Sequence, residues 1–81
     1  MAEPIIADQQ RRAQAALADS PIFDLRRLCV ESVDGRIIIS GRVASFYHKQ
    51  MAQEVVQSVL PDMEVVNQAD VPEYVSPVSN L

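Results

Sequence analysis

Two runs of strand-favouring apolar residues, interrupted by single or paired polar ones, flank Asp34-Gly35. The flanking segments, 26–33 and 36–43, are rich in β-branched residues. An Asp-Gly dipeptide tolerates the positive φ angles of a two-residue type I′ turn. The sequence therefore predicts a β-hairpin whose register starts with Val33 opposite Arg36 and reaches Cys29 opposite Ser40.

This register sorts the side chains of the hairpin onto two faces, because successive residues of a strand point to opposite sides. One face is apolar and is expected to pack in the core: Leu28, Val30, Ile37, Ile39 and Val43. The other face is mixed and is expected to stay open: Cys29, Glu31, Val33, Arg36, Ile38 and Ser40.

Two helices are predicted around the hairpin. Residues 7–19 are rich in Ala, Gln and Arg, which favour helix, and this helix should end before Pro21. Residues 45–60 place apolar side chains at i, i+3, i+4, i+7 and i+8, which draws one stripe along a helix: Ala52, Val55, Val56, Val59 and Leu60. Ser45 is a good N-cap for that helix.

The rest of the chain completes an α-β-β-α-β order. Residues 22–25 are expected to form a connector whose apolar side chains seal one end of the core, and residues 64–71 a third strand. These elements predict an α+β two-layer sandwich, with a three-stranded mixed sheet and two helices on one face. The domain is expected over residues 7–71, between a flexible N-terminus, 1–6, and a disordered tail, 72–81.

Charge and composition narrow the possible functions of this 81-residue chain. Its net charge is −4, divided into +1 before residue 50 (seven bases, six acids) and −5 after it (five acids). An acidic chain neutralises phosphates poorly, which argues against nucleic-acid binding. A single cysteine excludes an internal disulfide. No apolar run is long enough for a transmembrane segment.

The N-terminus lacks the features of a signal peptide. A cytoplasmic location is therefore expected for the chain as written. A membrane-peripheral or periplasmic location is expected only if the true N-terminus is missing.

Several of these motifs occur together in one known family. The run from Val30 through Asp34-Gly35 to Gly41-Arg42-Val43, followed by Lys49 and Ala52 in the helix and Asn67 in the last strand, resembles the BON domain, the bacterial osmotically inducible and nodulation domain. The resemblance covers about residues 13–71. One departure is the segment 60–63, Leu-Pro-Asp-Met, which stands where the family typically has Gly-Val.

The resemblance implies a non-enzymatic module of bacterial envelope or osmotic-stress proteins that attaches to phospholipid membranes. In the family the domain often occurs in tandem, whereas this chain holds one copy. The residues themselves show no combination of acid, base, nucleophile and metal ligands, so we expect no enzyme activity, no cofactor and no metal site.

Two candidate binding surfaces remain. Phe46, Tyr47, His48 and Lys49 put aromatic rings and a cation at the start of an amphipathic helix, where they can meet a lipid headgroup boundary. The alternative is that both rings pack on the loops or on the first helix, and that His48 is a neutral, half-packed residue. The open sheet face offers Cys29 and Ile38. The candidate charges for anionic lipid or an acidic partner are Arg26, Arg27, Arg36 and Arg42.

These surfaces support two hypotheses. The first is a BON-type adaptor that attaches to a phospholipid membrane or to an envelope or stress-response assembly. The second is a soluble interaction module that uses the open sheet face or the edge of the third strand to bind a protein partner or to form a homodimer, without lipid binding.

Overall fold

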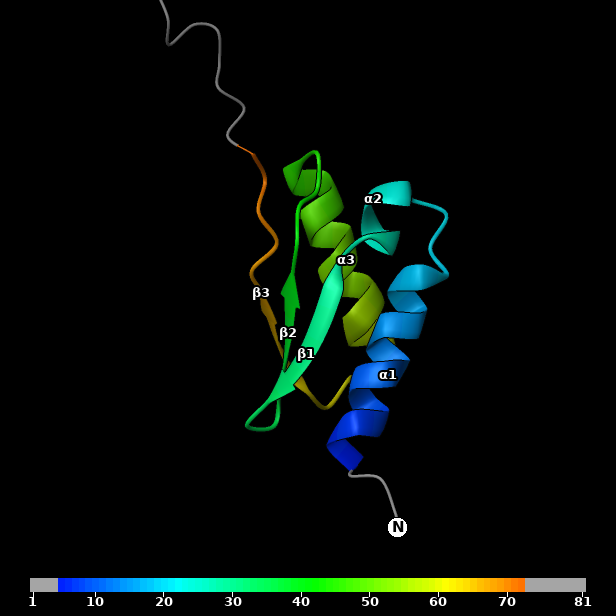
Figure 1. Cartoon of the computed structure of the whole chain (residues 1–81), viewed down its shortest axis with the longest axis vertical. Helices are drawn as coiled ribbons and strands as arrows, with labels where there is room; N and C mark the ends of the chain where they lie inside the picture. Colours follow the sequence, from blue (N-terminus) through cyan, green and yellow to red (C-terminus); the bar gives the residue numbers. More distant parts are fainter. Residues whose placement is uncertain (1–4, 73–81) are drawn as a thin grey trace, which may run out of the picture.

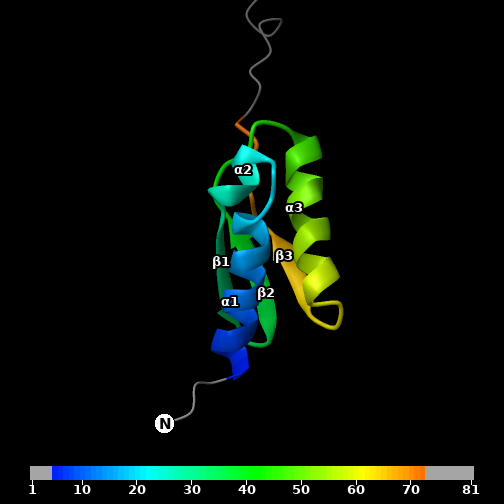
Figure 2. The ribbon, with the colours of Figure 1, turned by 90° about the vertical axis from the view of Figure 1, so that its right-hand side faces the viewer.

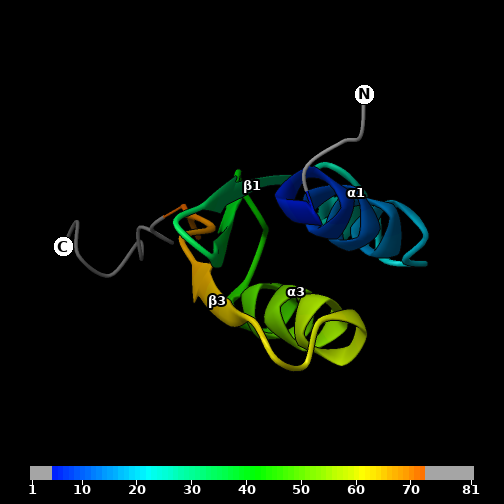
Figure 3. The same ribbon diagram turned by 90° about the horizontal axis from the view of Figure 1, so that it is seen from below.

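A three-stranded sheet and two long helices form the two layers of the protein (Figure 1). The computed structural model describes residues 5–72. The elements follow the expected order, with one additional short helix: α1 (Ile5–Ala18), α2 (Phe23–Arg26), β1 (Cys29–Val33), β2 (Arg36–Ser40), α3 (Phe46–Val59) and β3 (Glu64–Asn67). Viewed from below, α1 and α3 lie side by side on one side of the sheet (Figure 3). The α+β sandwich with a mixed sheet is therefore confirmed.

The hairpin has the predicted register. Cys29 pairs with Ser40 and Val33 with Arg36, with every pair between them as expected. Asp34 and Gly35 have φ angles of 49° and 79°, which are the positive values that a type I′ turn requires. The hairpin turn thus fixes which side chains reach the core.

The third strand joins β2 in parallel, so β2 is the central strand. The regular pairing runs only from Glu64 to Asn67, which is shorter than the expected strand over 64–71. Beyond it, the backbone N–H of Gln68 donates to Ile39 (2.8 Å) and that of Asp70 to Gly41 (2.7 Å). The chain therefore continues alongside β2 after β3 has formally ended.

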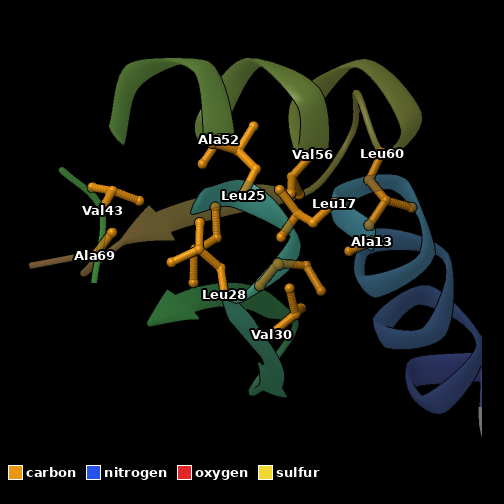
Figure 4. Packing of buried hydrophobic residues seen from close by; sticks show 12 residues of the cluster. Ala13, Leu17, Leu25, Leu28, Val30, Val43, Ala52, Val56, Leu60 and Ala69 are labelled. Atoms are coloured by element: carbon orange, nitrogen blue, oxygen red, sulfur yellow. The ribbon is translucent and has the colours of Figure 1, made fainter. Parts of the chain in front are cut away.

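The core lies between the sheet and the two long helices (Figure 4). All five residues assigned to the inner face of the hairpin are buried. From the predicted stripe of α3, Ala52, Val56 and Leu60 are buried, and Val55 and Val59 pack against them. The buried apolar side chains of this core are all aliphatic: Ala13, Leu17, Leu25, Leu28, Val30, Ile37, Ile39, Val43, Ala52, Val56, Leu60 and Ala69.

The segment between α1 and β1 departs from the expectation. Residues 23–26 form the helical turn α2, so β1 begins at Cys29 and not at Arg26. The Ser20 hydroxyl accepts the N–H of Ile22 (3.0 Å), and the carbonyl of Ile22 accepts the N–H of Leu25 (3.0 Å). Leu25 is buried as expected, but Phe23 points out of the core because one turn of helix cannot direct both side chains inward.

Glutamine side chains of α1 cover the outer edge of β1. Gln14 receives the N–H of Val30 on Oε1 (2.9 Å) and donates from Nε2 to the carbonyl of Leu28 (2.7 Å). Gln10 receives the N–H of Ser32 on Oε1 (2.9 Å). Side chains thereby bind the outward N–H groups of Val30 and Ser32 and the carbonyl of Leu28, where a neighbouring strand would otherwise pair.

The termini were expected to be flexible. Helix α1 begins at Ile5, two residues before the predicted start of the helix. The remaining expectations of a flexible N-terminus and a disordered tail concern mainly residues 1–4 and 73–81, which lie outside the described residues.

Candidate functional site

Three aromatic side chains are exposed at one end of the molecule. Helix α2 and the first turn of α3 lie at this end, opposite the hairpin turn (Figures 1 and 2). Phe23 on α2 is 61% exposed, and Phe46 and Tyr47 on α3 are 73% and 66% exposed. We call residues 23–27 and 41–49 the aromatic end. Exposed aromatic side chains that share one end of a domain are a candidate interaction surface.

The local structure of α3 explains why its two rings face solvent. Ser45 caps the helix, and its hydroxyl accepts the N–H of His48 (3.2 Å). The cap sets the helix so that Ala52 and Val56 face the core. Phe46 and Tyr47 then fall outside the buried stripe. The alternative that these rings pack on the loops or on α1 is therefore wrong.

The aromatic end is also basic. It contains Arg26, Arg27, Arg42 and Lys49 against one acid, Asp24, which gives 4 − 1 = +3 in a chain whose net charge is −4. The guanidinium groups of Arg26 and Arg27 lie 5.5 and 5.6 Å from the centre of the Phe23 ring. These are cation–π distances, so cationic groups surround an exposed ring.

Asp24 connects α2 to the start of α3. Its Oδ2 accepts the backbone N–H of Ala44 (2.6 Å) and lies 3.1 Å from Nδ1 of His48. The Ala44 N–H, and secondly the His48 side chain, lower the pKa of Asp24 below its ordinary value. The carboxylate is thus engaged within the protein, and His48 is a half-buried residue with a defined partner.

An open pocket of about 370 Å³ lies between α2 and the segment that follows β2. Its size is within the ~300–1,000 Å³ of small-molecule sites. Arg27 and Arg42 line it, and over residues 5–72 neither guanidinium forms an ion pair. The other lining residues are Asp24, Val43, Ala44 and Pro72. The pocket therefore presents two available cations beside the exposed rings.

The structure separates the predicted candidate residues into two groups. Phe46, Tyr47, His48, Lys49 and Arg42 belong to the aromatic end. The remaining three lie on the open sheet face, where Cys29 and Arg36 are exposed and Ile38 is half-buried. The apolar area of that face is small, since Val33 and Val66 are the other large apolar side chains on its described strands, beside Ile38.

Sequence reasoning missed Phe23 and Asp24, and it named Arg27 as a charge for anionic lipid without placing it beside an aromatic ring. The available signal was the spacing of Phe23 to Arg26 and Arg27, at i+3 and i+4, which places a ring and two cations on one helical face. Its use required knowing that residues 23–26 form a helix. The contact of Asp24 with His48 joins positions 24 residues apart and has no local signal.

Neither a metal site nor a membrane span is found in the described part of the chain. No group of three or more His, Cys, Asp or Glu residues is placed to hold a metal ion between residues 5 and 72. Among the helices of that part, none is long and apolar enough to cross a membrane.

The fold and the aromatic end define a small α+β module of the binding type. A family model for the BON domain matches residues 6–73, which is most of the chain and more than the sequence motifs had indicated. The chain belongs to the BON domain family. A search of curated proteins gave no match.

Proposed function

We propose that this protein is a non-enzymatic module that attaches peripherally to phospholipid surfaces through its aromatic end. The observation that carries the proposal is the coincidence of three exposed aromatic rings with an excess of basic residues at one end of the domain. Membership of the BON family supports it, because phospholipid binding is the function attributed to this domain.

Two physical contributions would hold the protein at the membrane: insertion of the aromatic rings and electrostatic attraction of the basic residues. Aromatic side chains are favourable at the interface between headgroups and acyl chains, where Phe46 and Tyr47 would insert. Each basic residue near an anionic surface contributes about 1 kcal/mol. The acidic remainder of the chain is expected to oppose this only weakly, because charges beyond the Debye length of about 8–10 Å are screened.

The pocket adds a site for a lipid phosphate. Arg27 and Arg42 line it, neither forms an ion pair with another residue between 5 and 72, and guanidinium groups suit phosphate oxygens. Asp24 also lines the pocket, but its Oδ2 already accepts two internal contacts. We infer that a headgroup phosphate would bind between the two arginines while the rings enter the interface.

In the cell, the proposed role is that of an adaptor. A module that holds a phospholipid surface with one end leaves its sheet face available to a further component of an envelope or stress-response assembly. The location that follows is peripheral to a membrane.

Vesicle co-sedimentation tests the proposal. The chain is mixed with vesicles of phosphatidylcholine alone or with added phosphatidylglycerol, at low and at physiological salt. We expect binding that increases with the anionic lipid and weakens with salt. The double variant Phe46→Ser, Tyr47→Ser should lose most of it, because both rings lie at the proposed interface.

Matched controls use residues away from the aromatic end. Val33→Ser removes an exposed apolar residue beside the hairpin turn, and Arg36→Gln removes a base from the same region. Both should bind vesicles like the wild type, whereas Arg42→Gln should bind less. Absence of vesicle binding by the wild type at low salt, or equal losses in the control variants, would refute the proposal.

A further inference from the structure

The two outer edges of the sheet differ in how their backbone groups are satisfied. Gln10 and Gln14 occupy the edge of β1. The other edge belongs to β3. There the described side chains bind only the carbonyl of Met63 (from Gln57, 3.0 Å) and the N–H of Ala69 (to Asn67, 3.1 Å), so the strand between them is left uncovered. An uncovered edge presents N–H and C=O groups to which another strand can pair.

The available groups on β3 follow from its pairing with β2. The backbone N–H groups of Gln68 and Asp70 point to β2. Because backbone groups alternate in direction along a strand, those of the even-numbered residues point to β2, and those of Val65 and Asn67 point to the free edge. The outward N–H of Ala69 is taken by Oδ1 of Asn67 (3.1 Å). The outward backbone groups of Val65 and Asn67 have no hydrogen-bond partner in the described chain.

We propose that β3 pairs with β3 of a second copy of this chain in antiparallel orientation, forming a six-stranded sheet across a two-fold axis. In this arrangement Val65 exchanges two hydrogen bonds with Asn67 of the second copy, and Asn67 exchanges two with Val65. All four outward groups of each copy are then satisfied. This inference is independent of the lipid-binding proposal, because β3 contributes no residue to the aromatic end.

The register of this pairing favours a second copy as the occupant. On the open face, Val66 lies opposite Val66 and next to Ile38 in both copies, which joins two small apolar areas into one. Glu64 lies opposite Gln68, so no like charges face each other between residues 64 and 68. A two-fold interface uses the same surface on both copies, so that surface must be complementary to itself, as this pairing is.

The covered edge of β1 sets the size of the assembly. Once the two β3 edges have paired, the outer strands of the six-stranded sheet are the two β1 strands. There the carbonyl of Leu28 and the N–H groups of Val30 and Ser32 are bound to glutamine side chains. Pairing therefore ends at a dimer and does not continue into a fibre.

Sedimentation equilibrium of the full chain tests the proposal with Val65→Pro. Proline removes the outward N–H of residue 65 but leaves every hydrogen bond between β2 and β3, because residue 65 does not donate to β2. Val65→Ala is the matched control, since it loses the side chain and keeps the N–H. Circular dichroism and thermal melting verify that each variant is folded.

The wild type and Val65→Ala should show an average mass that rises with concentration from 9.0 kDa toward twice that value. Val65→Pro should stay a monomer. We expect association with a Kd of about 1 mM or tighter. A wild type that stays at 9.0 kDa at ~1 mM, or a folded Val65→Pro that associates like the wild type, would overturn the proposal.

Cross-linking provides a second, geometric test in a Cys29→Ser background. Val66 opposite Val66 is a non-hydrogen-bonded pair with Cα atoms about 4.5 Å apart, which allows a disulfide. Val66→Cys should therefore form a covalent dimer on oxidation. Ile38→Cys should not, because three strand spacings separate the two copies of residue 38 by about 14 Å. Equal cross-linking of both variants, or none with Val66→Cys, contradicts the register.

Discussion

The hydrogen bonds of Gln14 provide a quantitative test of how the sheet edge is stabilised. Gln14→Ala removes the acceptor for the N–H of Val30 and the donor to the carbonyl of Leu28, at 2.9 and 2.7 Å. A hydrogen bond contributes about 0.5–1.5 kcal/mol net, so the two together contribute about 1–3 kcal/mol. A domain of this length has a total stability of about 4–12 kcal/mol.

Urea unfolding followed by circular dichroism measures this loss. The midpoint should fall while the m-value stays constant, because the surface exposed on unfolding is unchanged. Alanine is a slightly better helix former than glutamine, so helix propensity opposes the expected effect and cannot produce it. In thermal melts, each 1 kcal/mol should lower Tm by about 4–8 °C.

Gln9→Ala is the matched control, because Gln9 is a half-buried glutamine on the same helix whose side chain forms no hydrogen bond with the part of the chain that the structure describes. The stability lost by Gln10→Ala should lie between the losses of these two variants, since it removes one hydrogen bond, from the N–H of Ser32. The reasoning is refuted if Gln14→Ala loses less than about 0.5 kcal/mol or no more than Gln9→Ala.

Two further variants test the backbone and the aromatic end. Gly41→Ala should lose about 1–3 kcal/mol in urea unfolding, because φ is +124° and the new Cβ would lie 2.9 Å from Cδ2 of Leu28. Gly35→Ala, with open space around its Cβ, should lose less. Because the pKa of Asp24 is lowered in the folded state, its stabilisation is present above the unfolded pKa of about 3.9 and is lost as pH falls through the folded pKa. Asp24→Asn should therefore lose less stability than the wild type on acidification below about pH 4. Equal acid dependence of the two proteins would contradict this.

The hairpin was predictable to the level of single pairs because its information is local. Asp34-Gly35 determines the turn, the turn determines the register, and the register determines the buried face. The stripe of α3 was predictable for a similar reason, since one helix period orders the positions from Ala52 to Leu60.

The candidate site was only partly predictable. The exposure of Phe46 and Tyr47 follows from their offset from the stripe of α3, which the sequence shows. The position of Phe23 at the same end of the domain depends on α2, a four-residue helix preceded by the hydrogen bond from Ile22 to the Ser20 hydroxyl. So short a helix has no periodicity to detect, and its placement is decided by tertiary contacts such as that of Asp24 with Ala44.

The spacing of the glutamines that cover β1 also limits how far α1 can follow that edge. Positions i and i+4 of a helix are about 6.0 Å apart along its axis, whereas two residues of a strand span about 6.8 Å. The spacing of the helix positions is thus about 0.8 Å shorter than the spacing of the strand positions. Two flexible glutamine side chains can compensate for this difference. The next position on that helical row toward its C-terminal end is Ala18, whose methyl group cannot bond a backbone. The cover of this edge by α1 therefore ends at Leu28, one residue before β1 begins.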